Sequence, residues 1–142
     1  MMGENWNDAG SGFHPVSAPD YLPAPQLREL QLRRLKAVVE RAYANVPPFR
    51  ERMAERGLTP ASIETLADLA KLPFSIKTDL RDNYPFGLFA SPMSEIVRLH
   101  ASSGTTGKPI VVAYTQEDLQ VWASVMLRTF SACSIHRGDI VQ

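Results

Sequence analysis

Cysteine is almost absent from this sequence, which has one, Cys133, among 142 residues. A single thiol cannot close a disulfide within the chain, and it cannot build the cysteine cluster of a structural zinc site. We expect Cys133 to be a small buried side chain on a helix rather than a nucleophile, because no base can be identified beside it.

The sequence also lacks an excess of one charge and a long apolar run. Its 15 acidic residues balance its 15 basic residues, which argues against a nucleic acid or an anionic membrane as the main partner. No apolar run approaches the roughly 20 residues that span a bilayer. The amino terminus has neither the basic nor the apolar part of a secretory signal. These absences predict a cytoplasmic protein whose partners are neither nucleic acids nor membranes.

The most informative segment is a loop rich in glycine and hydroxyl groups, SSGTTGKP at residues 102–109. Gly104 and Gly107 allow successive backbone N–H groups to turn toward an anion. The serine and threonine hydroxyls add neutral donors or a contact to magnesium, and Lys108 adds a positive charge. This combination is typical of a site that binds phosphate groups.

The flanks of the loop indicate how it is held. Residues 96–100 and 110–114 are short runs rich in β-branched side chains, so the loop is expected to connect two strands of a hairpin. It is not a Walker A loop, which requires four residues between its first glycine and its Gly-Lys pair, whereas two stand there in this sequence. Pro109 prevents the loop from opening directly into a helix interior. Amides, hydroxyls and Lys108 must therefore supply the field that attracts an anion. The alternative is a solvated turn without a ligand.

The first half of the chain is expected to be helical after a flexible arm. Residues 1–25 are rich in small and polar residues and predict that arm. An amphipathic helix follows, and Pro47-Pro48 ends it. A short charged helix is expected through about Arg56, with Gly57 as its terminator. The apolar face of the long helix consists of Leu27, Leu30, Leu35, Val38, Val39 and Ala42.

Two further helices are predicted before the hairpin. Thr59-Pro60 is a helix start that would direct Ile63, Leu66 and Leu69 inward. Residues 77–81 predict a short helix whose mixed charges form a solvated face.

After the hairpin, Thr115 and Asp118 form a variant of the capping box. The helix that they begin should run to about Ser134. Its apolar stripe is expected to be core and consists of Leu119, Trp122, Met126, Leu127 and Phe130.

The last residues predict a turn at 137–139 and then the start of a buried strand at Ile140-Val141. A buried strand without a continuation would leave backbone groups unpaired. We therefore expect residues 26–142 to be a partial domain that continues beyond the chain end, inactive in isolation. Its uncovered apolar patch should promote association and centres on Trp122, Met126, Phe130, Ile140 and Val141.

The loop resembles the phosphate-binding signature of the adenylate-forming enzymes, which include acyl-CoA synthetases, luciferases and peptide-synthetase adenylation domains. Within this superfamily the chain is similar to the phenylacetate-CoA ligase family over about residues 26–142. The superfamily usually places a lysine after the proline, whereas this chain has Ile110 there and Lys108 before it. The segments that carry the resemblance are Leu30–Lys36, Ala42–Pro47, Leu72–Gly87 and His100–Pro109.

The resemblance implies an α/β fold, with amino-terminal helices followed by a β-hairpin phosphate loop and a helix, in the front part of the large domain of an adenylate-forming enzyme. It implies ATP-dependent activation of an aryl acid, phenylacetate in the first place, through an acyl adenylate to the coenzyme A thioester. ATP, Mg²⁺ and coenzyme A would be the cofactors, and a homodimer is the assembly that it suggests.

The resemblance also assigns residues to the ATP phosphates, with Thr105 and Thr106 as the contacts to Mg²⁺. No catalytic residue is expected in this segment, because the adenine, ribose and carboxy-terminal lysine motifs do not occur in it. The phosphate-binding residues are Ser102, Ser103, Gly104, Thr105, Thr106, Gly107 and Lys108.

Two alternatives stay open. The chain could be a non-catalytic helical interaction module whose loop is only a turn, or a ligase for another aryl carboxylate such as benzoate. His100 abuts the loop and could orient a phosphate, but a histidine at a strand end is more often a structural hydrogen-bonding group.

Overall fold

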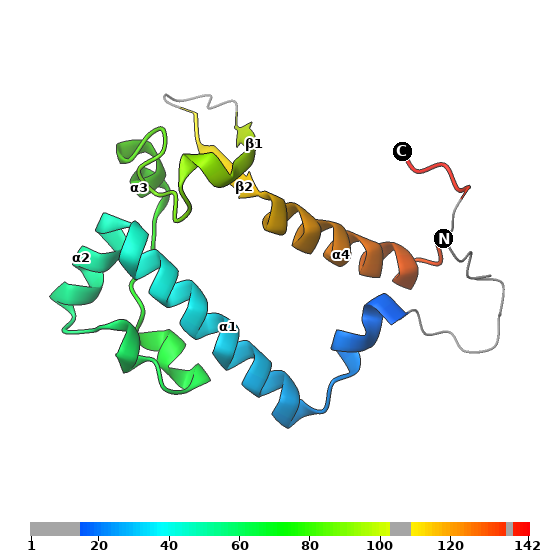
Figure 1. The fold of residues 1–142 in the computed structure, drawn as a ribbon, viewed down its shortest axis with the longest axis horizontal. Helices are drawn as coiled ribbons and strands as arrows, with labels where there is room; N and C mark the ends of the chain where they lie inside the picture. The colour runs from blue at the N-terminus through cyan, green and yellow to red at the C-terminus, as the bar shows by residue number, and fades with distance from the viewer. Residues whose placement is uncertain (1–14, 103–108, 136–137) are drawn as a thin grey trace.

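The computed structural model describes residues 15–102, 109–135 and 138–142. Two long helices, α1 (Ala24–Asn45) and α4 (Gln116–Ala132), form the arms of an open frame (Figure 1). Shorter helices and a β-hairpin join the arms at one end. The 3-10 helix η1 (Pro15–Tyr21) lies against α4 at the other end. The helices and the hairpin confirm the predicted α/β class.

Helices α1 and α2 (Pro47–Glu55) are delimited as their prolines predict. Helix α1 has Pro23 as its N-cap and a proline in its first turn, where the missing N–H costs no helical hydrogen bond. Val46 is extended and ends α1 while it caps α2. Gly57 follows α2 with a φ of 65°, a left-handed conformation that glycine adopts readily.

A small apolar core lies where α1, α2 and the following loop meet. Val39, Met53 and Ile63 are each at most 2% exposed. These three residues come from different elements, so their burial fixes the corner of the frame. The side chains packed around them are Leu35, Tyr43, Phe49, Leu58 and Leu72.

The segment after Thr59 differs from the single helix that was expected. It forms two 3-10 helices, η2 (Pro60–Ser62) and η3 (Leu66–Lys71), each with its own capping box. Ile63 lies between them in an extended conformation and is buried, as predicted. Leu69 is 57% exposed, so its predicted inward position is wrong. The second capping box begins a new helix at Thr65, so Leu69 lies on another face than a single continuous helix would give it.

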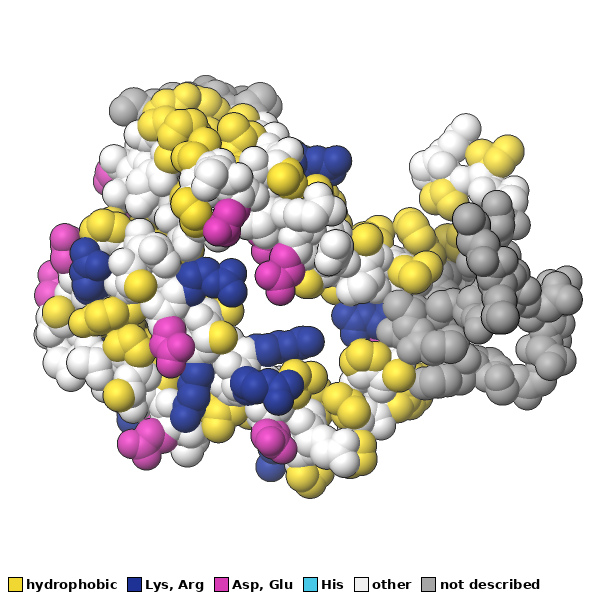
Figure 2. All heavy atoms as spheres, in the orientation of Figure 1, with side chains coloured by type: hydrophobic (Ala, Val, Ile, Leu, Met, Phe, Trp, Pro, Cys, Tyr) yellow, Lys and Arg dark blue, Asp and Glu magenta, His cyan; other side chains and the backbone are white. Residues whose placement is uncertain are grey.

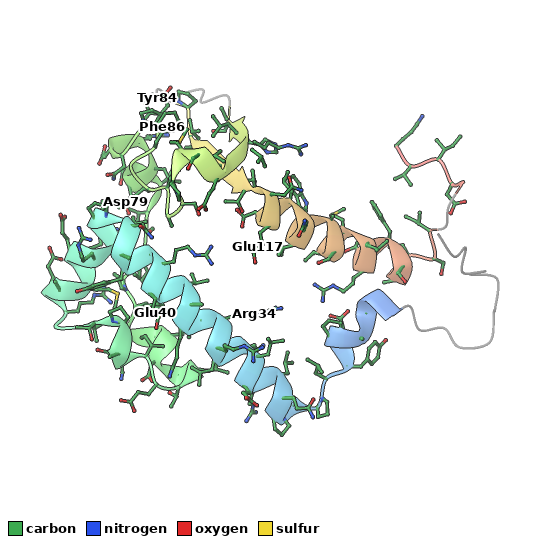
Figure 3. All side chains as sticks on the ribbon, in the orientation of Figure 1. Arg34, Glu40, Asp79, Tyr84, Phe86 and Glu117 are labelled. Carbon is green, nitrogen blue, oxygen red and sulfur yellow. The ribbon has the colours of Figure 1, made fainter. Side chains whose placement is uncertain are left out.

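The predicted short helix is present as α3 (Lys77–Asp82). Its charges are not only a solvated face, because Asp79 is buried at 7% exposure and paired with Arg52 of α2. Asp79 accepts hydrogen bonds from the two terminal guanidinium nitrogens of Arg52, Nη1 and Nη2, and from the backbone N–H of Ile76. Asp79, which is labelled in Figure 3, therefore anchors α3 to α2.

A 3-10 turn, η4 (Met93–Glu95), leads into strand β1 (Ile96–Ala101), which pairs antiparallel with β2 (Val111–Thr115). Ala101 lies opposite Val111, and the pairing is regular from there back to Arg98, which lies opposite Tyr114. A bulge interrupts the pairing between Arg98 and Ile96. The two strands predicted at residues 96–100 and 110–114 are thus confirmed. Helix α4 begins directly after β2.

The end of the described chain contradicts the prediction of a buried strand. Residues 138–142 contain no strand. The exposure of Ile140, at 91%, instead fits the predicted uncovered apolar patch. Gly138 has a φ of 107°, which fits the predicted turn there. Within the described residues, no helix is long and apolar enough to cross a bilayer.

Candidate functional site

The two strands of the hairpin bring both ends of the predicted phosphate loop together. The backbone N–H of Ser102 donates to the carbonyl oxygen of Ile110 at 3.0 Å. The N–H of Ile110 donates in return to Ser102 Oγ at 3.3 Å. Pro109, between the loop and Ile110, has no N–H to compete for these acceptors. The base of the loop is therefore closed by a reciprocal pair of hydrogen bonds.

Ser102 is the one predicted phosphate contact within the described residues. Its side chain is exposed, and its hydroxyl oxygen acts as an acceptor in the bond from Ile110. A serine hydroxyl can accept and donate at once, so this geometry leaves its hydrogen available to an anion.

The other predicted phosphate contacts, and with them the two predicted magnesium contacts Thr105 and Thr106, lie outside the described residues. They stay predictions from the sequence. These residues are Ser103, Gly104, Thr105, Thr106, Gly107 and Lys108.

A capping box connects the hairpin rigidly to α4. The N–H and the hydroxyl of Thr115 both donate to Asp118 Oδ2 at 2.8 Å, and the N–H of Asp118 donates to Thr115 Oγ1 at 3.2 Å. The hydrogen bonds from the backbone and then the hydroxyl of Thr115 lower the pKa of Asp118, and the charge of Arg41 on α1 acts in the same direction. The predicted capping box is confirmed.

Three rings pack together where the hairpin meets α4. The rings of Tyr114 and Trp122 are stacked with centroids 5.5 Å apart and an interplanar angle of 28°. His100 meets Tyr114 edge-on at 5.0 Å and Trp122 edge-on at 5.9 Å. We call these three residues the ring cluster. His100 therefore has a structural contact two residues before Ser102, as its position at a strand end suggested.

The sequence reasoning missed the ring cluster because it assigned Trp122 to the core stripe of α4. Trp122 is 42% exposed, and the prediction that this stripe is buried is wrong for Trp122, Met126 and Leu127, whereas Leu119 and Phe130 are half-buried. A signal was present in the spacing, since His100 and Tyr114 fall on the same face of the hairpin once Ala101 pairs with Val111. The exposed apolar residues of α4 are Val121, Trp122, Val125, Met126 and Leu127.

Opposite charges border an opening between α1 and α4. The space-filling view shows this opening, with basic side chains along its α1 side (Figure 2). Arg34 extends from α1 toward it, and Glu117 extends from the first turn of α4 (Figure 3). Arg41 lies close enough to lower the pKa of Asp118. The two arms thus present complementary charges to each other.

Neither a thiol site nor a metal cluster appears in the part of the chain that the structure describes. Cys133 is exposed at the carboxyl end of α4, so the prediction of a buried cysteine is wrong. Among the described residues, no group of three or more His, Cys, Asp or Glu side chains could hold a metal ion. The candidate functional site is the hydroxyl-rich loop, whose base is closed by Ser102 and Ile110.

Comparison with known proteins gives a consistent set of relatives. No protein-family model matches the chain. The phenylacetate-coenzyme A ligase of Pseudomonas putida is 56% identical over 115 residues, which are 81% of this chain and 26% of that protein. The phenylacetate-coenzyme A ligase of Aromatoleum evansii is 53% identical over 116 residues, which are 82% of this chain and 26% of that protein.

A solved structure agrees with these relatives. The crystal structure of 2-hydroxyisobutyryl-CoA ligase in complex with 2-HIB-AMP and CoA is 32% identical and superposes with a TM-score of 0.75 over 83% of this chain and 26% of that one. The chain therefore spans about a quarter of the length of the curated relatives that it matches.

Proposed function

We propose, on the premise that this chain belongs to the phenylacetate-coenzyme A ligase family, that it supplies the phosphate-binding loop of a ligase that activates an aryl acid with ATP. In the proposed reaction the carboxylate of the acid attacks the α-phosphate of ATP and gives an acyl adenylate and pyrophosphate. Coenzyme A then displaces AMP and forms the thioester. Phenylacetate is the proposed acid, because it is the substrate named for the relatives.

The observation that carries this proposal is the closed base of the loop in a chain about half identical to these ligases. The proposed task of the loop is to stabilise the negative charge that develops on pyrophosphate as it departs. Preorganised amide and hydroxyl donors are effective for this purpose, because they need no reorganisation as the charge appears. The hydroxyl of Ser102 and the donors of residues 103–108 would bind the phosphate oxygens, with Lys108 as the cation.

The donor set of the loop also suits magnesium. Threonine hydroxyls and phosphate oxygens are hard oxygen ligands, which Mg²⁺ prefers, and it commonly binds through few protein groups together with substrate phosphates. We propose Thr105 and Thr106 as its contacts. The ion would neutralise charge on the phosphates.

A hybrid ligase tests the proposal. In this hybrid, the matching 115 residues of the Pseudomonas putida ligase are replaced by those of this chain. We expect it to exchange pyrophosphate into ATP in the presence of phenylacetate and to form the thioester when coenzyme A is added. The same hybrid with Gly104→Val is the matched control, because a β-branched side chain disfavours positive φ and would occupy space in a phosphate cradle.

The outcomes separate the proposal from a non-catalytic interaction module. A hybrid that melts cooperatively yet forms no adenylate, beside an active parent ligase, contradicts a phosphate-binding role. If the complete hybrid does not fold, a narrower exchange of residues 96–132, the hairpin and α4, gives the same comparison. Assays of the hybrid and of its parent ligase with both acids distinguish phenylacetate from benzoate.

A further inference from the structure

The ring cluster lies between the candidate loop and the helix that follows it. His100 belongs to β1, Tyr114 to β2 and Trp122 to α4. Arg98 lies opposite Tyr114 and His100 lies opposite Val112, so His100 and Tyr114 are diagonal neighbours on one face of the hairpin. Trp122 covers both rings from α4. One indole ring thus contacts both strands that lead into the loop.

The ring cluster is too exposed to be part of the core. Trp122 is 42% exposed and His100 is exposed, whereas the core residues Val39, Met53 and Ile63 are almost fully buried in another part of the frame. The mutual orientation of the rings is nevertheless specific, with one stacked pair and two edge-on pairs. Such geometries are the favoured ones for aromatic rings.

The junction between the hairpin and α4 indicates that the ring cluster fixes the orientation of the hairpin. Thr115 ends β2 and caps α4, so no spacer residue separates the two elements. The capping box fixes the first turn of the helix, while the rings fix the tilt of the hairpin against the second turn. His100 then leads through Ala101 to Ser102, where the two hydrogen bonds with Ile110 close the base of the loop.

We propose that Trp122, through its contacts with Tyr114 and His100, is a positioning residue for the phosphate-binding loop. It does not touch the reacting groups in this proposal. It holds the angle at which the hairpin presents Ser102 and the residues that follow. This inference rests on the proposed function of the loop.

Paired substitutions in the hybrid ligase test the inference. Trp122→Leu removes the ring but keeps an apolar side chain, and Trp122→Phe keeps a ring that can stack on Tyr114. Leu127→Ala is the control, because Leu127 is exposed on the same helix but is not in the ring cluster. The readouts are the rate of adenylate formation, the rate of thioester formation from adenylate supplied ready-made, and the melting temperature.

We expect Trp122→Leu to slow adenylate formation roughly tenfold to a hundredfold, the scale on which small misplacements of reacting groups act. Thioester formation and the KM for phenylacetate should change little, because pyrophosphate has already left and the acid does not bind the loop. Trp122→Phe should restore most of the adenylation rate. Leu127→Ala should leave both rates close to those of the parent hybrid.

Each other result is informative. Equal losses in the two half-reactions, or a Trp122→Phe variant as slow as Trp122→Leu, would assign the ring cluster to stability alone and overturn the inference. A folded parent hybrid that forms no adenylate at all would instead contradict the proposed function. The difference in tryptophan fluorescence between the parent hybrid and its Trp122→Phe variant gives a second readout. Addition of magnesium pyrophosphate should change that difference if the cluster is coupled to the loop, and an unchanged difference counts against it.

Discussion

Arg52 of α2 holds Asp79 of α3 with two parallel hydrogen bonds. Its Nη1 lies 2.6 Å from Asp79 Oδ2, and its Nη2 lies 2.5 Å from Asp79 Oδ1. The same Nη1 also donates to the carbonyl oxygen of Phe74 at 3.1 Å. Bidentate guanidinium–carboxylate pairs are stronger and more directional than single contacts. This pair therefore fixes the segment that leads from the core corner toward the hairpin.

The Arg52–Asp79 pair should make the stability of the folded chain depend on pH in the acid range. The hydrogen bonds from Arg52 and then from the N–H of Ile76 lower the pKa of Asp79 from 3.8 to about 2. A carboxyl group with a lowered pKa stabilises the folded state above its unfolded pKa, and this contribution is lost as the pH falls toward its folded pKa. The melting temperature of Asp79→Asn should therefore be below that of the unmodified chain at pH 6, and the gap should shrink between pH 4 and pH 2.

Asp82→Asn is the control for this prediction, since Asp82 is exposed in the same helix. Thermal melts of both variants across the acid range provide the measurement. A gap between the unmodified chain and Asp79→Asn that stays constant down to pH 2 would show that the pair does not carry the pH dependence.

Removal of the cap on α4 should weaken the junction with the hairpin. Thr115→Ala loses the acceptor for the N–H of Asp118 and the hydroxyl that donates to its carboxylate. Loss of such an N-cap costs about 1 kcal/mol of unfolding free energy. Denaturant unfolding should show this loss, and amide hydrogens of residues 116–118 should exchange faster. Thr115→Ser retains the hydroxyl and should behave nearly as the unmodified chain does, whereas a loss as large as that of alanine would argue against capping.

Replacement of Lys108 should affect one half-reaction more than the other. In the hybrid ligase, Lys108→Ala removes a charge that gains importance as the bond to pyrophosphate breaks, so adenylate formation should slow by roughly tenfold to a thousandfold. Thioester formation should suffer less. Pre-steady-state assays of the two steps provide the measurement, with Lys36→Ala on α1 as the exposed control. A pure change in the KM for phenylacetate would contradict the assigned role.

The apolar face of α4 should make the isolated chain associate. Val121 and Val125 lie one turn apart on this face, with 57% and 43% of their surfaces exposed. Contiguous exposed apolar surface of this kind favours contacts between copies. Sedimentation should detect concentration-dependent association, which Val121→Ser with Val125→Ser should reduce. An unmodified chain that sediments as a monomer at every concentration, with the same profile as the double variant, would refute this expectation.

The elements predicted correctly depend on neighbours in the sequence. Pro47, Gly57 and the Thr115 capping box act within one or two turns, so their effects can be read from a short window. The hairpin could be predicted in the same way, because β-branched runs flank a loop of small residues. For the candidate site, this local reasoning predicted the two strands that flank the loop, whereas the hydrogen bonds between Ser102 and Ile110 are visible only in the structure.

The errors concern contacts between distant segments. Asp79 is buried because Arg52, 27 residues earlier in the chain, is there to pair with it. The residues of α4 looked like core because their spacing is helical, but Trp122, Met126 and Leu127 stay exposed although η1 and the hairpin contact the helix. Likewise, the register of the hairpin and the path of α4 together determine that Trp122 reaches His100.

The ion pair between Asp20 of η1 and Arg128 of α4 joins the amino-terminal end of the described chain to the far end of α4. Its atoms are 2.8 Å apart, yet its residues are separated by 108 positions in the sequence. An exposed ion pair of this kind adds little to the stability of the fold. Dissolved salt weakens such a pair, because charges are screened over about 10 Å at 0.1 M ionic strength. We therefore expect higher ionic strength to weaken the contact of η1 with α4, while the corner around Met53, held by apolar contacts, should be insensitive to it.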